Sequence, residues 1–171
     1  IFTTPAPVTV DVAKQFTDLN DVLVLSAAAG VSIVDLQTAL PNASVSRMIP
    51  NIPVAVNAGT IGVTLDPGLS NDQRQSLRTV IAALGDIIDV KESQLDIVGT
   101  VGGCSPAFVD VMMDALSDGA VMEGLDRKTA YQIVASMVKG SGTLAYESKE
   151  APAVLRDQVA SPGGTTIRGI A

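Results

Sequence analysis

Apolar residues recur in two rhythms along the chain, and the rhythm changes near residue 92. In residues 1–92, short apolar runs alternate with segments whose apolar side chains are three or four residues apart. From residue 93 the spacing is helical almost to the end. Strands are expected near residues 1–7, 21–26, 45–49, 57–65 and 86–90, and helices over 8–16, 33–40, 71–84, 106–124 and 130–144.

The first three strands are separated by helices, and this order predicts a parallel sheet with right-handed crossovers. The run Asp21–Ser26 is almost wholly apolar after its first residue, as in a parallel strand that is buried on both faces. The pattern is typical of the back half of a doubly wound sheet. No Gly-x-Gly-x-x-Gly sequence follows any expected strand, so the main pyrophosphate site of such folds is not expected here.

The predicted fold class is therefore α/β followed by all-α. Residues 1–92 are expected to form the C-terminal part of a Rossmann-like dinucleotide-binding domain with a parallel sheet. Residues 93–171 are expected to form a helical domain. Because the expected sheet starts in the middle of such a domain, the sequence resembles a fragment of a longer protein.

Local signals set several boundaries. Ser32 is expected to cap the helix 33–40, and Ser70 with Gln73 has the spacing of a capping box. Asp126 is expected to cap the helix that follows it. The pair Gly102–Gly103 is expected to break one helix, with Pro106 in the first turn of the next.

The two long helices of the second region have apolar faces that they do not bury against each other alone. Pairing with a second copy would cover them, so a homodimer or a higher homo-oligomer is expected. The faces comprise Val109, Met112, Met113, Leu116 and Ala120 in one helix, and Ala130, Ile133, Val134, Met137, Ser141 and Leu144 in the other.

Composition removes several classes of function. The net charge of −7 argues against a nucleic-acid partner, whose phosphates require Lys and Arg. The chain has no His, so His-based acid–base chemistry and His-containing metal sites are excluded, and no metal site is expected. Cys104 is the single Cys and cannot form an internal disulfide; with no secretory leader visible, a cytoplasmic location is expected. No apolar run reaches the ~18–20 residues that cross a bilayer, so no membrane partner is expected.

The most informative stretch lies near the end, at Val159–Ile167. Pro162 fixes one backbone angle, and Gly163 and Gly164 allow a tight turn and a close approach to a ligand. Thr165 and Thr166 then begin an expected helical turn, whose first N–H groups have no partner inside the helix and can hold an anion. The alternative is an ordinary helix N-terminus after a Gly-rich loop.

The residues Leu155–Thr166 resemble the C-terminal signature of pyrroline-5-carboxylate reductases, and weaker matches extend back to Ile1. The resemblance implies hydride transfer from a nicotinamide cofactor, NADPH or NADH, to 1-pyrroline-5-carboxylate, giving L-proline. It places the substrate on Ser161, Gly163, Gly164, Thr165 and Thr166. The Thr166 hydroxyl would face the ring nitrogen and is the implied catalytic group.

The same resemblance implies cofactor-binding residues at three strand ends, namely Thr3 and Thr4, Ala27, Ala28 and Ala29, and Asn51. Small residues at such strand ends let a ring lie against the backbone. The alternatives are that Ala27–Ala29 are only closely packed and that Asn51, between two prolines, is only a turn residue. Related reductases form interleaved helical dimers in which each active site uses both chains.

The sequence departs from the family pattern at several positions. Ile52 replaces a Thr, Cys104 replaces a Ser, Ser105 replaces a Gly and Phe108 replaces a Tyr. Cys104 without a His base has little to activate it as a nucleophile. These departures motivate two alternatives: a related reductase of another imine or keto acid, and a dimerising or regulatory relative without turnover.

Overall fold

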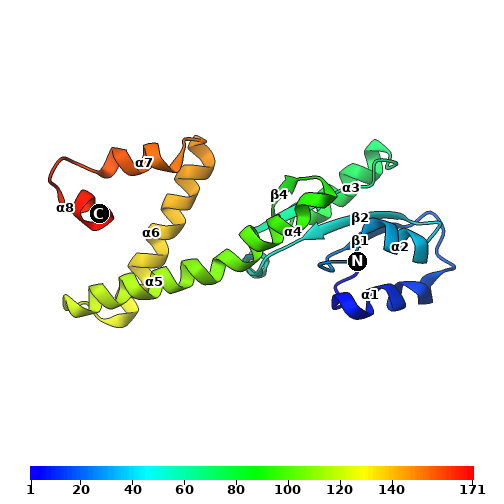
Figure 1. Cartoon of the computed structure of the whole chain (residues 1–171), viewed down its shortest axis with the longest axis horizontal. Coiled ribbons are helices and arrows are strands. Elements are labelled where there is room, and N and C mark those ends of the chain that lie inside the picture. The colour runs from blue at the N-terminus through cyan, green and yellow to red at the C-terminus, as the bar shows by residue number, and fades with distance from the viewer. The chain divides into compact units, whose positions relative to one another are not determined.

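The computed structural model describes all of residues 1–171, which form two compact units, Ile1–Phe108 and Val109–Ala171. The first unit contains the sheet and its covering helices, and the second contains helices only (Figure 1). This confirms the expected α/β region followed by an all-α region. The domain boundary expected at residue 92 stays a prediction, because the two compact units do not by themselves define domains.

The first unit is a four-stranded sheet with strand order β1-β2-β3-β4. Phe2 forms a parallel bridge to Ser26 and extends the sheet beyond β1. The elements of this part are α1 (Ala6–Ala13), β1 (Leu23–Ser26), α2 (Ile33–Ala39), β2 (Ser44–Ile49), β3 (Gly59–Thr64), α3 (Asn71–Ala82) and β4 (Gly85–Asp89), with 3₁₀ turns at Lys14–Phe16, Ile52–Val56 and Glu92–Gln94.

The sheet is mixed, which corrects the expectation of a parallel sheet. Phe2, β1 and β2 run parallel as expected, and β3 and β4 are parallel to each other. However, β2 and β3 are antiparallel. The reason is the connection: residues 50–58 contain only a short 3₁₀ turn, which cannot make the crossover of a dozen or more residues that a parallel neighbour requires.

Two apolar clusters cover the two faces of the sheet. Side chains of α1 and α2 pack on one face, around Leu36 and Val45. Side chains of α3 pack on the other, around Leu77 and Ile81, against Ile61 of β3. The expected caps are present, because Ser32 accepts from the Asp35 N–H and Ser70 accepts from the Gln73 N–H.

The link from β4 to the helical region is fixed by a buried ion pair. Glu92 Oε1 accepts from Arg47 Nη1 at 2.9 Å and from the Ile33 N–H, the first of α2, at 2.7 Å. The Arg47 side chain is 5% exposed and the Glu92 side chain 32% exposed. Residue 92 is thereby attached to β2 and α2 at once.

Residues Glu92–Met122 form one continuous helical stretch, so the expected break at Gly102–Gly103 is wrong. The stretch passes from α4 (Leu95–Val98) through a π-helical segment (Gly99–Cys104) into α5 (Ser105–Met122). Glycines weaken a helix without ending it, so Gly102–Gly103 do not stop this one.

By length and composition alone this 31-residue stretch could cross a membrane, which corrects the expectation that no segment meets that test. Isolated carboxylates such as Asp96 and Asp110 interrupt it, so it does not stand out as one apolar run. A single helix of this kind is weak evidence for a membrane span.

The second unit continues α5 and adds α6 (Arg127–Ser148), α7 (Pro152–Val159) and α8 (Thr165–Ile170). Asp126 caps α6 as expected, by accepting from the Thr129 N–H at 3.0 Å. The Tyr131 hydroxyl donates to Asp114 at 2.8 Å and joins α6 to α5. That hydrogen bond raises the pKa of Tyr131, because it favours the protonated phenol.

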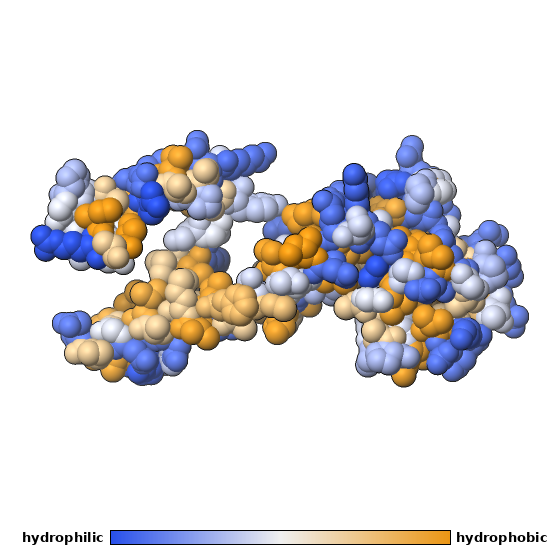
Figure 2. All heavy atoms as spheres, in the orientation of Figure 1, coloured by the Kyte–Doolittle hydropathy of each residue, from blue (hydrophilic) through white to orange (hydrophobic).

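Very little of the second unit is buried. Only Ser117, Ala130 and Val134 are buried there, whereas large apolar side chains are exposed along its helices. Figure 2 shows apolar surface gathered along the α5 region. The exposed apolar residues of the unit include Val111, Met112, Leu116, Met122, Tyr131, Ile133, Met137, Leu144, Tyr146, Val154 and Val159.

We predict that Glu92→Ala lowers the stability of the first unit, because it leaves the Arg47 guanidinium buried without a carboxylate. The cost should be about 1–3 kcal/mol, below that of a fully buried pair since Glu92 is partly exposed. Thermal unfolding should shift by about 2–4 °C per kcal/mol. Glu92→Gln keeps an acceptor and should cost less; equal melting of wild type and Glu92→Ala would contradict the anchoring role.

Candidate functional site

The three parallel segments of the sheet end at the same edge, and the predicted cofactor residues follow directly after them. Phe2 and β1 are joined by hydrogen bonds from the Phe2 N–H to the Leu25 carbonyl at 2.9 Å and from the Ala27 N–H to the Phe2 carbonyl at 2.8 Å. Neighbouring β1 and β2 pair up to Ser26 and Arg47. Ligands of open α/β sheets bind beyond this edge.

The first strand end is held in place by a buried hydroxyl. Thr9 is fully buried, and its Oγ1 lies 3.0 Å from the Pro5 carbonyl oxygen, to which it can donate. The hydroxyls of Thr4 and Thr9 are 2.9 Å apart, so Thr4 is tied to α1. Thr3 is exposed.

The second strand end contains both closely packed and open alanines. Ala28 is buried at 3% exposure, and its N–H donates to Ser26 Oγ at 3.3 Å. Ala27 is half-buried and Ala29 is exposed. Of the three, Ala29 is the one that lines an open pocket.

That pocket has a volume of about 250 Å³ and lies where β1 and β2 end against α4 and the π-helical segment. We call it the strand-end pocket. Its walls are mostly small or apolar, with Asp96, Thr100 and Cys104 as the polar exceptions. The lining residues are Ala29, Ile49, Pro50, Leu95, Asp96, Gly99, Thr100, Gly103 and Cys104.

The glycines of this pocket matter for its shape. A Cβ at Gly99 would lie 3.3 Å from the Ile49 side chain, and a Cβ at Gly103 would point into open space. A flat ring can therefore lie close to the backbone at this wall. The residues present fit a nicotinamide ring, which is flat and largely uncharged in its reduced form.

Asn51, at the third strand end, is half-buried and its side-chain amide is already engaged within the chain. Its Nδ2 donates to the Gly102 carbonyl at 2.9 Å, and its Oδ1 accepts from the Thr60 N–H at 2.9 Å. Sequence reasoning placed Asn51 at this edge but missed both of its partners.

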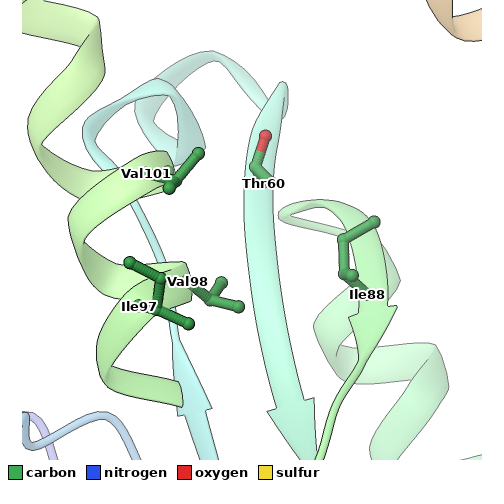
Figure 3. A pocket seen from close by; sticks show the side chains of 6 residues that line it. Thr60, Ile88, Ile97, Val98 and Val101 are labelled. Carbon is green, nitrogen blue, oxygen red and sulfur yellow. The ribbon is translucent and has the colours of Figure 1, made fainter. Parts of the chain in front are cut away.

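A second hollow, of about 310 Å³, is lined by Thr60, Ile88 and the outer side of the helical segment. Figure 3 shows Val98 and Val101 on this segment beside the strand that carries Thr60. Its walls are almost wholly apolar, and its remaining lining residues are Ile97 and Gly102. Sequence reasoning did not identify this hollow, because the hollow depends on how the helical segment packs beside Thr60 at the start of β3.

The C-terminal loop, in the second unit, has the predicted turn. The Gly164 N–H donates to the Ser161 carbonyl at 3.0 Å, and Gly163 has φ +68°. Pro at the second and Gly at the third position of this turn match the type II pattern. α8 begins directly afterwards at Thr165, so the first N–H groups of α8 are free of helical partners.

A side chain at Gly164 would meet the Ser161 hydroxyl, which would have to rotate away, and its Cβ would lie 3.3 Å from the Ser161 carbonyl oxygen. Ser161, Gly163, Thr165 and Thr166 are exposed, so the turn presents its backbone to the surroundings.

The comparisons with known proteins agree with this geometry. Residues 92–171 match the family model described as pyrroline-5-carboxylate reductase dimerisation. Pyrroline-5-carboxylate reductase of Synechocystis sp. is 38% identical over 152 residues, which is 89% of this chain and 57% of that protein. The Escherichia coli enzyme of the same name is 36% identical over 88% of this chain and 56% of its own length.

The chain is similar to pyrroline-5-carboxylate reductases along most of its length. A solved structure of a pyrroline-5-carboxylate reductase from Coxiella burnetii has the same fold, with a TM-score of 0.88 at 29% identity. The match covers 98% of this chain and 64% of that one. The chain thus spans a little over half the length of the curated reductases that it matches.

Proposed function

We propose that the protein carrying this chain is a pyrroline-5-carboxylate reductase. It would transfer a hydride from NADPH or NADH to the C=N carbon of 1-pyrroline-5-carboxylate, while the ring nitrogen carries a proton, and release L-proline and the oxidised cofactor. The observation that carries this proposal is the 36–38% identity to reductases of that name over nearly nine-tenths of the chain.

The strand-end pocket is the proposed seat of the nicotinamide. Thr3, Thr4, Ala27, Ala28, Ala29 and Asn51 would contact the bound cofactor, and of these Ala29 lines the pocket itself. When bound there, the cofactor supplies the hydride. The chain's own contribution is to hold the ring against small residues at the carboxyl ends of the strands and to exclude water from one of its faces.

The C-terminal turn is the proposed substrate site. The backbone N–H groups of Gly164, Thr165 and Thr166 would bind the substrate carboxylate, with Ser161 and Gly163 shaping the turn. The Thr166 hydroxyl would hydrogen-bond the ring nitrogen. A protonated imine is already electrophilic, so orientation and electrostatics suffice without a strong base, in agreement with the absence of His.

Pairing of two chains is part of the proposal. The helices of the second unit expose apolar side chains that a soluble monomer rarely leaves uncovered. The dimerisation description of residues 92–171 supports a homo-oligomer. We propose a homodimer or higher homo-oligomer in which each active site uses both chains.

The same pairing accounts for the apolar stretch Glu92–Met122 without a membrane. A helix face that packs on a partner chain has the composition of a core helix, whereas lipid would leave Asp110 and Asp114 without water or a partner cation. We therefore propose a cytoplasmic protein with no membrane and no nucleic-acid partner.

One alternative substrate class is favoured by specific positions. Cys104 lines the strand-end pocket. Ile52, two residues after the lining residue Pro50, is 78% exposed. Both residues depart from the family pattern. A related reductase of another imine or a keto acid would use this altered lining. A relative that only dimerises is the other alternative, and steady-state assays with pyrroline-5-carboxylate and both cofactors separate the three.

The first prediction for this function concerns Thr166. In the protein that carries this chain with a complete dinucleotide-binding half, Thr166→Ala should remove one hydrogen bond of roughly 0.5–1.5 kcal/mol. The expected loss in kcat/KM is on the order of tenfold, at ~1.4 kcal/mol per decade. Gly164→Val should lose more, because a β-branched side chain beside the first N–H groups of α8 would displace the Ser161 hydroxyl and occupy the proposed carboxylate site.

Thermal melting measured on the same samples separates a lost site from a lost fold. Ser148→Ala, an exposed change at the end of α6, is the matched control and should keep wild-type kinetics. If Thr166→Ala and Gly164→Val both retain wild-type kcat/KM, the turn is only a helix start and the substrate site lies elsewhere.

The second prediction concerns the cofactor seat. Cys104 is the only thiol, it is exposed, and it lines the strand-end pocket. A small alkylating reagent should modify it, and in the protein that carries this chain with a complete dinucleotide-binding half, saturating NADPH or NADH should slow this modification at least ~5-fold, because protection scales with occupancy of the pocket. Alkylation followed by mass spectrometry gives the rate; an unchanged rate with bound cofactor would place the nicotinamide outside this pocket.

The third prediction is that the chain self-associates. Sedimentation at micromolar concentration should show at least a dimer. Val111→Glu with Leu116→Glu should shift it toward monomer, because a buried unpaired carboxylate costs several kcal/mol at an interface. Lys139→Glu, an exposed charge change on α6, is the control. A wild-type monomer that keeps its helices would contradict the proposed pairing.

A further inference from the structure

The π-helical segment has a cause in the sequence that follows it. In an α-helix the carbonyl of Gly102 would accept from the N–H of residue 106. Residue 106 is Pro, which has no N–H and whose ring pushes against the carbonyl four residues before it. The regular turn is therefore impossible at this point, and the chain forms a wider one over Gly99–Cys104.

Asn51 supplies the donor that Pro106 lacks. Its Nδ2 lies 2.9 Å from the Gly102 carbonyl oxygen. The orientation of the amide is forced by chemistry, because Gly102 offers only an acceptor here and Thr60 only a donor.

The other end of the same amide satisfies a second unpaired backbone group. β2 pairs with β3 only from Gly62 to Thr64, so the Thr60 N–H has no strand partner on that side. Asn51 Oδ1 accepts from it at 2.9 Å. The Asn51 side chain thus bonds both the Gly102 carbonyl, which Pro106 leaves without a donor, and the Thr60 N–H, which β2 does not reach.

We propose that Asn51 is a positioning residue, whose amide joins β3 to the π-helical segment and thereby sets the wall of the strand-end pocket. Gly99, Thr100, Gly103 and Cys104 all come from this segment and line that pocket. Figure 3 shows the segment running alongside β3 at Thr60. The importance of this wall for a nicotinamide rests on the function proposed above.

The geometry explains why the join matters for the wall. Each residue of a helix turns by about 100° from the last, so removing the wide turn would rotate the lining residues away from the pocket by about that angle. Wide turns of this kind are frequent at functional sites. The alternative is that Asn51 only stabilises the fold, and the two roles predict different kinetics.

Combining Asn51→Ala with Pro106→Ala separates the two roles. Asn51→Ala should raise the KM for NADPH or NADH about 10-fold, with a smaller change in kcat, and lower the melting temperature. Adding Pro106→Ala returns an N–H at residue 106, so the Gly102 carbonyl regains a helical partner. The double variant should therefore recover part of the lost melting temperature, since the Thr60 N–H still lacks its acceptor, but not KM, because the straightened helix no longer presents the same wall.

Two further measurements need no turnover. The Thr60 N–H should lose protection from hydrogen exchange in Asn51→Ala and keep it in Asn51→Asp, which retains the acceptor. The alkylation rate of Cys104 should rise at least ~3-fold in Asn51→Ala, because the wall is no longer held. Asn71→Ala, an exposed change at the start of α3, should alter none of these quantities.

The outcomes are distinct from those that test the function. A wild-type protein that does not reduce pyrroline-5-carboxylate contradicts the proposed function, while changes in Thr60 exchange and Cys104 alkylation still support the role of Asn51. Recovery of KM together with melting temperature in the double variant would overturn the positioning role. So would unchanged Thr60 exchange and Cys104 alkylation in Asn51→Ala.

Discussion

A proline that cannot donate a hydrogen bond governs how this chain leaves its sheet. Pro106 prevents a regular turn, the helix widens over Gly99–Cys104, and the free Gly102 carbonyl meets the Asn51 amide. Since the widened segment also forms one wall of the strand-end pocket, the shape of that pocket depends on a missing N–H several residues away. The fold, the pocket and the start of the helical region are coupled through this one constraint.

The features that were predicted correctly from sequence are local ones. The caps at Ser32, Ser70 and Asp126 and the turn at Ser161–Gly164 need only a few neighbouring residues to form. Capping energies and turn preferences act over such distances, so the sequence is sufficient to reveal them. The order of strands and helices in the first half follows for the same reason.

The features that were missed depend on contacts between distant segments. The antiparallel direction of β3 relative to β2 follows from a connection too short for a crossover, and the π-helical segment is joined to β3 through the side chain of Asn51. The partners of Asn51 lie 9 and 51 residues away in the sequence, so no local sequence pattern predicts them. Pro106 was the available signal, because a proline inside a helix always frees the carbonyl four residues earlier.

The ion pair at Glu92 has an evolutionary consequence. The family match begins at this residue, yet its carboxylate is bound to Arg47 and to the first N–H of α2, which precede the matched region in the same compact unit. A recombination event that exchanged the region from residue 92 onward would have to supply a carboxylate at the same position, or it would leave the buried Arg47 guanidinium unpaired. In this chain, the region from residue 92 onward is therefore not an independent module.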